Sequence, residues 1–163
     1  MEYKTSLDSL AKVVTIFVII LFLWLGIISI KGLINPIDTT SIIIHSALLL
    51  LYISTLLGTW LYAPKKYIID ENRLIIVRAI GNLVIHRKDI KQVIILNEKE
   101  SRQSFRTFGV GGLFGYFGKF YLRNYGYVNF YTTQHKNKIL ILTQNDQKLV
   151  LTPDDSSMAH QLT

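Results

Sequence analysis

The chain has 163 residues, 50% of them hydrophobic, and its mean hydropathy of +0.31 is too high for an ordinary soluble domain of this size. Eighteen Lys and Arg residues against eleven Asp and Glu residues give a net charge of +7, which suits an anionic membrane surface or nucleic acid as partner. Cysteine is absent, and this excludes disulfides, thiolate metal sites and cysteine nucleophiles.

Two long apolar runs occupy the first part of the chain. Val13–Ile30 is eighteen residues without a charge, and Ile42–Ala63 is twenty-two residues with His45 as its only ionisable group. A bilayer core of roughly 30 Å requires about 20 apolar residues in a helix. The first run is also longer than the apolar region of a signal peptide, and no cleavage motif follows it. We therefore expect two retained transmembrane helices, at about residues 13–34 and 42–63, joined by a short loop.

The charges that flank these runs predict their orientation. The loop between them carries only Lys31 and Asp38, whereas Lys4 and Lys12 precede the first run and several cations follow residue 64. Because positive residues are retained on the cytoplasmic side, we expect a multi-pass protein of the cell membrane with both termini in the cytoplasm. His45 lies about one turn from the start of its run, and we expect it to be neutral and near the interface rather than a functional group inside the span.

Short β-rich segments alternate with turn signals from Lys65 onward, a pattern typical of an all-β domain. Pro153 follows the last segment, and Asp154 or Asp155 can cap a short closing helix of about ten residues. We expect a transmembrane helical hairpin at residues 1–64, then a mainly β domain at 65–163, built as a seven-stranded antiparallel barrel, partly open, with a short C-terminal helix. The seven predicted strands are "YIID", "LIIVR", "LVIHR", "IKQVIIL", "YVNFYTT", "KILILTQ" and "KLVLT".

The order of hairpin, strands and closing helix resembles the bacterial pleckstrin-homology (PH-like) domain membrane protein family, in the form that begins with two membrane helices. The stretch "RTFGVGGLFGYFGKFYLRNYGYVNFYTT" and the closing "LTPDD" look like a signature of that family. The resemblance covers about residues 65–163 and implies a PH-like barrel, but it implies little about biochemistry. The closing helix is shorter than is usual in PH domains, which leaves open whether the membrane hairpin assists in capping the barrel.

The segment Gly109–Gly118 holds five of the ten glycines. It lacks the G-x-G-x-x-G spacing of a dinucleotide fingerprint, and Gly118-Lys119 is followed by Phe120, where a P-loop requires Ser or Thr. The segment is also too short to cross a bilayer. Two interpretations remain open. The segment is a long loop packed by its own aromatic side chains over the open end of the barrel, or its aromatic side chains contact a protein partner or the membrane interface.

In the second interpretation the aromatic side chains meet the partner or the interface, and nearby basic side chains meet lipid phosphates. Each basic residue near an anionic surface contributes about 1 kcal/mol. Aromatic residues mixed with basic ones also suit single-stranded nucleic acid, but no RNA-binding signature is present, and we do not expect a nucleic-acid partner. The predicted contact residues are Arg102, Arg106, Phe114, Tyr116, Phe117, Lys119 and Arg123.

The sequence shows no catalytic pattern. The four histidines lack metal-ligand spacing, and no G-x-S-x-G nucleophile motif is present. We therefore expect no catalytic residue, no metal site and no cofactor. The predicted function is a non-enzymatic binding or assembly module, anchored at the cytoplasmic membrane face, that contacts a protein partner, a second copy or anionic lipid. The alternative is an accessory subunit of a larger membrane enzyme or transporter complex.

Overall fold

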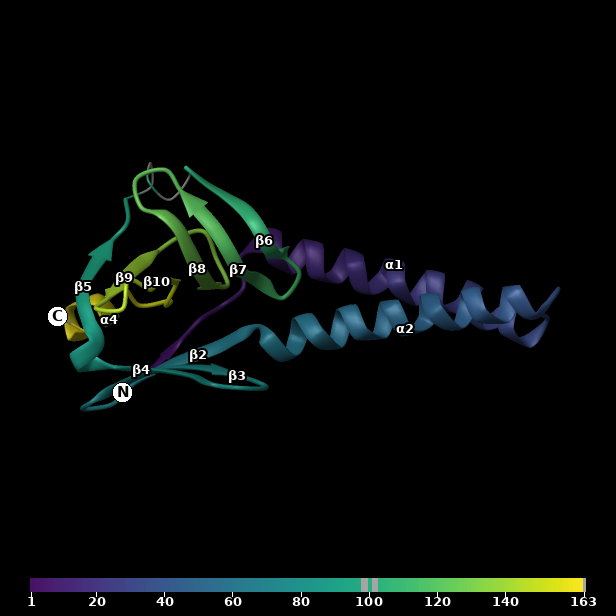
Figure 1. Ribbon diagram of the computed structural model, residues 1–163, viewed down its shortest axis with the longest axis horizontal. Coiled ribbons are helices and arrows are strands. Elements are labelled where there is room, and N and C mark those ends of the chain that lie inside the picture. Colours follow the sequence, from purple (N-terminus) through teal and green to yellow (C-terminus); the bar gives the residue numbers. More distant parts are fainter. Residues whose placement is uncertain (98–99, 101–102, 163) are drawn as a thin grey trace.

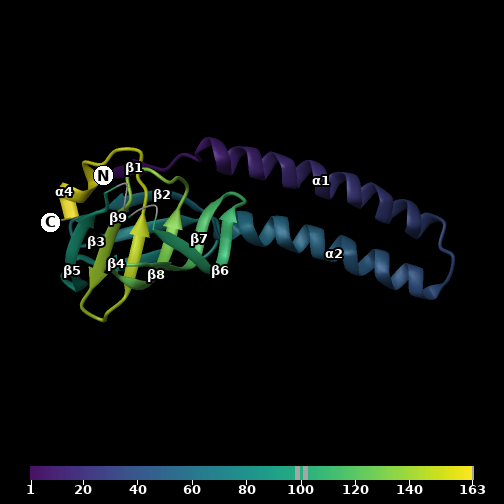
Figure 2. The ribbon, with the colours of Figure 1, turned by 90° about the horizontal axis from the view of Figure 1, so that it is seen from above.

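The computed structural model describes residues 1–97, 100 and 103–162. A mainly β unit lies at one end of the molecule, and two long helices project from it side by side (Figures 1 and 2). The helices are α1 (Ser9–Ile34) and α2 (Thr39–Tyr62). Both are long and apolar enough to cross a membrane by length and composition, with hydropathies of 3.0 and 1.9 over their most apolar windows.

Each long helix begins at an aspartate that accepts a hydrogen bond from a free backbone N–H of the first turn. Asp8 accepts from the Ala11 N–H at 2.8 Å, and Asp38 accepts from the Ser41 N–H at 2.7 Å. The helices thus begin four and three residues before the apolar runs that predict them. Their large apolar side chains are mostly exposed, which suits a lipid environment better than water.

The two helices contact each other at the middle of the pair and near the connecting loop. The rings of Phe22 and Tyr52 have their centroids 4.9 Å apart. Near the connecting loop, His45 lies against Gly32, where a Cβ atom would be 2.7 Å from the imidazole Cε1. The glycine therefore makes room on α1 for the histidine of α2, as small residues do at helix–helix contacts in membranes.

The β unit consists of two sheets. One has four strands in the order β1-β2-β3-β4, and the other has six in the order β5-β9-β10-β8-β7-β6. A single turn of 3₁₀ helix at Arg87–Asp89 joins the two sheets. The strands are β1 (Glu2–Lys4), β2 (Pro64–Ile69), β3 (Arg73–Arg78), β4 (Leu83–His86), β5 (Ile90–Ile95), β6 (Ser104–Gly112), β7 (Gly115–Leu122), β8 (Gly126–Thr132), β9 (Ile139–Thr143) and β10 (Lys148–Leu151).

The expectation of a partly open barrel of seven antiparallel strands is wrong in its number of strands and in its topology. All seven predicted segments do form strands, but the described residues form ten strands in two sheets, and β10 pairs with β8 in parallel. The three additional strands are β1, β6 and β7. A three-residue strand is too short to show a period of two, and the glycines of β6 and β7 lower the strand propensity of their segment.

Both faces of the six-stranded sheet are covered. One face packs against the four-stranded sheet, with Tyr67, Leu74 and Ile76 meeting Ile139 and Leu151. The other face holds a second cluster that includes Phe120, Phe130, Leu140 and Val150 and receives Ala11 from α1. Tyr67 also connects the two sheets by hydrogen bonds, because its hydroxyl donates to the Tyr131 carbonyl at 2.6 Å and accepts from the Thr152 N–H at 3.2 Å.

The C-terminal helix α4 (Met158–Leu162) has only five residues, about half the predicted length. Its buried Met158, Ala159 and Leu162 belong to the cluster between the two sheets. Asp155 accepts a hydrogen bond from the Ser157 N–H at 2.9 Å just before the helix begins. The helix therefore closes the end of the core that lies far from α1 and α2 (Figure 2).

Candidate functional site

The glycine-rich segment is a hairpin of two strands rather than the expected loop. In β6 and β7, Gly109 pairs with Gly118 and Gly112 pairs with Gly115, so only residues 113–114 form the turn. Gly109 and Gly118 have φ of 127° and 119°. A Cβ atom at either position would lie 2.8 Å from the Cα of the other. The two backbones therefore approach at a distance and with a conformation that only glycine allows.

The start of α1 packs directly against this hairpin. The Thr15 hydroxyl, buried in the contact, donates to the Gly112 carbonyl at 3.3 Å and accepts from the Phe114 N–H at 2.9 Å. At Gly112 an added Cβ would lie 3.2 Å from a methyl group of Val14. The turn of the hairpin is thus the part of the β unit on which the first long helix rests.

Asp8 strengthens the same contact through several hydrogen bonds. Besides capping α1, its carboxylate accepts from the Tyr116 hydroxyl at 3.1 and 3.3 Å and from the His135 N–H at 3.2 Å. Burial, followed by this hydrogen bond to a carboxylate, raises the pKa of Tyr116 above its ordinary value. Sequence reasoning did not single out Asp8 or Thr15. An aspartate just before an apolar run is a helix N-cap signal, and it could have identified Asp8.

The structure separates the predicted contact residues into exposed and buried sets. Arg106, Lys119 and Arg123 are exposed, and Phe114 at the turn is half-buried. Tyr116 and Phe117 are buried, with 4% and 8% of their surface exposed. Arg102 lies outside the described residues. The basic side chains are therefore available to a partner, whereas the two aromatic ones contribute to the core on opposite faces of β7.

An aromatic and basic surface occupies the part of the six-stranded sheet that extends beyond the four-stranded sheet. Phe105, Tyr121 and Tyr127 are direct cross-strand partners on β6, β7 and β8. The ring centroid of Tyr121 lies 5.0 Å from that of Phe105 and 5.4 Å from that of Tyr127. Phe108, 78% exposed, pairs with Lys119 on the same face. We call these five residues the aromatic–basic face. Its signal in the sequence is the alternation of Phe117, Lys119 and Tyr121, which is visible only once β7 is known to be a strand.

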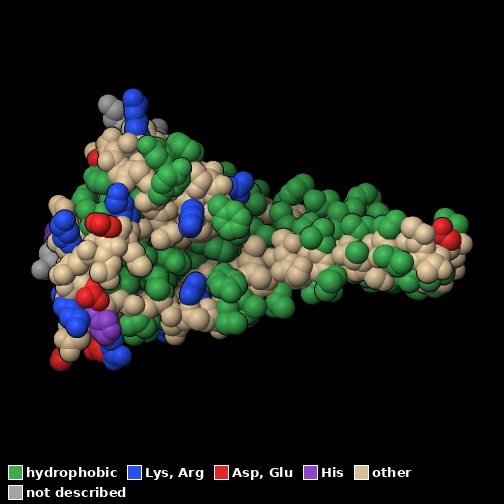
Figure 3. Space-filling view, in the orientation of Figure 1, with side chains coloured by type: hydrophobic (Ala, Val, Ile, Leu, Met, Phe, Trp, Pro, Cys, Tyr) green, Lys and Arg blue, Asp and Glu red, His purple; other side chains and the backbone are tan. Residues whose placement is uncertain are grey.

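A cavity of about 690 Å³, the junction cavity, lies between the end of α2 and the open end of the two sheets. Arg78 and Arg106 are its two charged lining residues, and aromatic side chains make up much of the remaining wall. Figure 3 shows blue basic side chains among green hydrophobic ones where the β unit meets the two helices. The lining residues are Gly58, Thr59, Tyr62, Arg78, Arg106, Thr107, Phe108, Gly109, Val110, Phe117, Gly118 and Tyr131.

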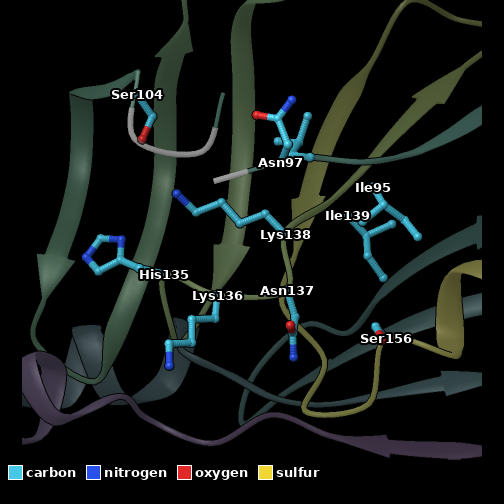
Figure 4. Close-up of a pocket in the computed structure, with 10 residues that line it drawn as sticks. Ile95, Asn97, Ser104, His135, Lys136, Asn137, Lys138, Ile139 and Ser156 are labelled. Carbon is cyan, nitrogen blue, oxygen red and sulfur yellow. The ribbon is translucent and has the colours of Figure 1, made fainter. Parts of the chain in front are cut away.

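A second cavity, of about 880 Å³, is lined in part by residues 135–139 (Figure 4). The Lys138 side chain extends into it, whereas Lys136 points away from Lys138. Burial lowers the pKa of Lys138 to about 8, and the Lys138 ammonium lies 5.1 Å from the Phe130 ring centroid. Partial burial, together with the charge of Lys138, lowers the pKa of His135 below its ordinary value.

The described lining of the two cavities offers neither a metal site nor a carboxylate base. Among the described residues, no three His, Asp or Glu side chains come close enough together to hold a metal ion. The described lining of both cavities contains no carboxylate that could act as general base. What the two cavities offer instead is positive charge beside apolar surface, an arrangement that suits the binding of an anionic, partly apolar group.

The comparison with known proteins identifies the β unit. Residues 65–161 match the family model described as bacterial PH domain. No curated protein and no solved structure matches the chain. The match extends over more than half of the chain and includes β2 to β10 together with most of α4. The protein therefore belongs to the bacterial PH domain family, with two long apolar helices in front of the domain.

Proposed function

We propose that this protein is a non-enzymatic membrane-anchored module that holds its PH-like domain at the cytoplasmic membrane face and binds a partner protein there. The observation that supports this best is the direct packing of α1 on the β6–β7 hairpin through Asp8 and Thr15. A domain fixed in this way presents the same surface to the membrane-proximal space at all times.

The aromatic–basic face is the surface that we assign to the partner. Tyr127 and Phe108 are 70% and 78% exposed, although large aromatic side chains usually lie inside a domain. Aromatic residues are enriched in protein interfaces. The partner is expected to be acidic, because the whole net charge of +7 belongs to residues 65–163.

Site-specific photocrosslinking of the full-length protein in its native membrane tests this assignment. A photoreactive phenylalanine analogue replaces Phe108 or Tyr127 in turn, and Val84 as the matched control. Val84 is also an exposed apolar strand residue, 44% exposed, but it lies on β4 in the other sheet. We expect one discrete crosslinked protein from positions 108 and 127 that is absent from position 84.

Extraction at alkaline pH tests the membrane anchor separately. We expect the full-length protein to stay with the membrane pellet, because two apolar helices of 26 and 24 residues hold it there. Release into the supernatant would contradict the anchor. Crosslinking that is equal at all three positions, or absent at 108 and 127, would contradict the partner surface and leave the anchor intact.

A further inference from the structure

The junction cavity lies beside the C-terminal end of α2, where the apolar stretch of this helix ends. β2 begins at Pro64, two residues after α2 ends at Tyr62, and Pro64 pairs with Arg78 in the sheet. The Ile80 N–H also donates to the Leu61 carbonyl, so the turn after β3 rests on the last turn of α2. Arg78 is therefore held level with the helix end, and this is where lipid headgroups lie if α2 spans a bilayer.

The end of α2 has the features of a membrane interface. Trp60 and Tyr62 lie in its last turn, 44% and 53% exposed. The Lys65 ammonium lies 3.9 Å from the centroid of the Trp60 ring. Aromatic side chains followed by a cation are typical of the headgroup region at the cytoplasmic end of a span. The cavity opens beside this turn, since Gly58, Thr59 and Tyr62 line it.

Two guanidinium groups give the cavity its charge. The Nε–H of Arg78 is buried and has no hydrogen-bond partner among the described residues, although a terminal nitrogen of the same group donates to the Gly81 carbonyl. Arg78 lies 5.6 Å from the ring centroid of Tyr62 and 5.8 Å from that of Tyr131. Among the described residues, no carboxylate forms an ion pair with Arg78 or Arg106. A buried N–H of this kind needs an acceptor, and a phosphate oxygen is a strong one.

Two glycines leave space in and around the cavity. Gly111 accommodates Arg106, because a Cβ atom there would lie 2.9 Å from a terminal nitrogen of the guanidinium. Gly58 faces open space, with no atom within 4 Å of the position where its Cβ would be. A larger residue at Gly58 would therefore enter the cavity without displacing the protein around it.

We propose that the junction cavity binds the phosphate-bearing headgroup of an anionic phospholipid. Arg78 and Arg106 contact the phosphate, and Tyr62 contacts the glycerol and the upper part of the acyl chains. The site shares Arg106 and Phe117 with the predicted contact residues, and it adds Arg78 from β3 and Tyr62 from α2. The inference rests on the proposed function only in requiring that α2 spans the membrane.

Thermal unfolding of the full-length protein in a neutral detergent tests the site. Short-chain phosphatidylglycerol is the probe, short-chain phosphatidylcholine tests the need for a negative headgroup, and inorganic phosphate tests whether free phosphate suffices. A ligand that binds only the folded state raises the unfolding temperature as its concentration exceeds its dissociation constant. We expect a saturable rise with phosphatidylglycerol that is at least twice the rise with phosphatidylcholine, and no rise with inorganic phosphate.

Two variants test the site independently of each other. Arg78→Gln/Arg106→Gln removes both charges, and Gly58→Leu fills the cavity while both arginines stay. Arg73→Gln/Lys91→Gln removes the same charge from exposed positions outside the cavity lining. We expect the phosphatidylglycerol response to be lost in the first two variants and kept in the third. If the double arginine variant does not fold, Gly58→Leu decides alone.

Several outcomes would overturn the inference. An equal rise with both lipids would show that the negative headgroup is not recognised, and a rise with inorganic phosphate would make the ligand a soluble anion instead. A response that survives in Gly58→Leu would place the lipid elsewhere. None of these results depends on a protein partner, and alkaline extraction reports separately whether the protein is anchored in the membrane.

Discussion

At the scale of single residues, the close approach of Gly109 and Gly118 makes the β6–β7 hairpin sensitive to substitution at both positions. Gly109→Ala or Gly118→Ala places a methyl group against the opposite backbone and strains a backbone with positive φ. We expect a loss of about 2–4 kcal/mol of unfolding free energy, the sum of backbone strain and overpacking. Urea titration of the full-length protein in mild detergent measures this loss.

Gly126 provides the matched control for that pair. Its φ of 74° is also positive, but an added Cβ meets no atom within 4 Å. Gly126→Ala should therefore cost only the strain, about 1 kcal/mol. Equal losses at positions 109 and 126 would show that the close backbone approach has no energetic consequence.

Lys138 is the residue with the clearest effect on stability as a function of pH. Its pKa is about 8 in the folded protein and about 10.4 in an unfolded chain. Between these values the unfolded chain holds a proton that the folded chain has released, so the free energy of unfolding rises with pH, by at most about 1.4 kcal/mol per unit. The same stability is lost as the pH falls from about 10.4 to about 8.

The measurement is the slope of unfolding free energy against pH from about 8 to about 10, a window set by these two pKa values. Lys138→Met replaces the ammonium with an apolar group of similar length, so we expect this variant to lose the positive contribution to the slope. Lys136→Met, at an exposed neighbouring position, should keep the slope of the parent. Parallel curves for all three proteins would contradict the lowered pKa.

At the scale of secondary-structure elements, the Thr15 hydroxyl contributes two of the hydrogen bonds between α1 and the β6–β7 hairpin. Thr15→Val keeps the shape of the side chain but leaves the Phe114 N–H without its acceptor. We expect a loss of about 1–3 kcal/mol, the usual cost of an unsatisfied buried donor. Thr55→Val is the control, because the Thr55 hydroxyl donates to the Leu51 carbonyl of its own helix and to no other group among the described residues. A loss of equal size in both variants would place the effect in the helices rather than at the contact.

The strands show which secondary-structure elements sequence patterns can predict and which they cannot. Runs of apolar and β-branched residues located seven strands, because packing on a sheet imposes a period of two. The same reasoning missed β6 and β7, since glycines that pair across two strands look locally like turn residues. The site was harder to find. Thr15 and Gly112 are 97 residues apart in the chain, and a local pattern carries no information about such a pair.

At the scale of the whole molecule, the pair of helices α1 and α2 is connected to the domain at both of its ends, before α1 and after α2. α2 passes into β2 through Ala63 alone, and α1 is joined to β1 by residues 5–8, which bond to the domain at Thr5, Ser6 and Asp8. β1 pairs with β2. Residues that precede α1 in the chain therefore complete a sheet whose other strands follow α2. Neither helix is attached through a free linker. The domain therefore keeps one position relative to the two helices, and the junction cavity stays beside the end of α2.

This arrangement predicts a topology that labelling can measure, because the chain has no cysteine of its own. Ile37→Cys lies in the loop between the helices, where Ile37 is 95% exposed. Asn145→Cys lies in the exposed turn between β9 and β10. Since the cations cluster in residues 65–163, we expect that part to remain in the cytoplasm. A membrane-impermeant maleimide should label position 37 in intact spheroplasts and position 145 only after the membrane is permeabilised. The reverse pattern would place the PH-like domain outside the cell, and labelling of neither position before permeabilisation would mean that the loop does not cross the membrane.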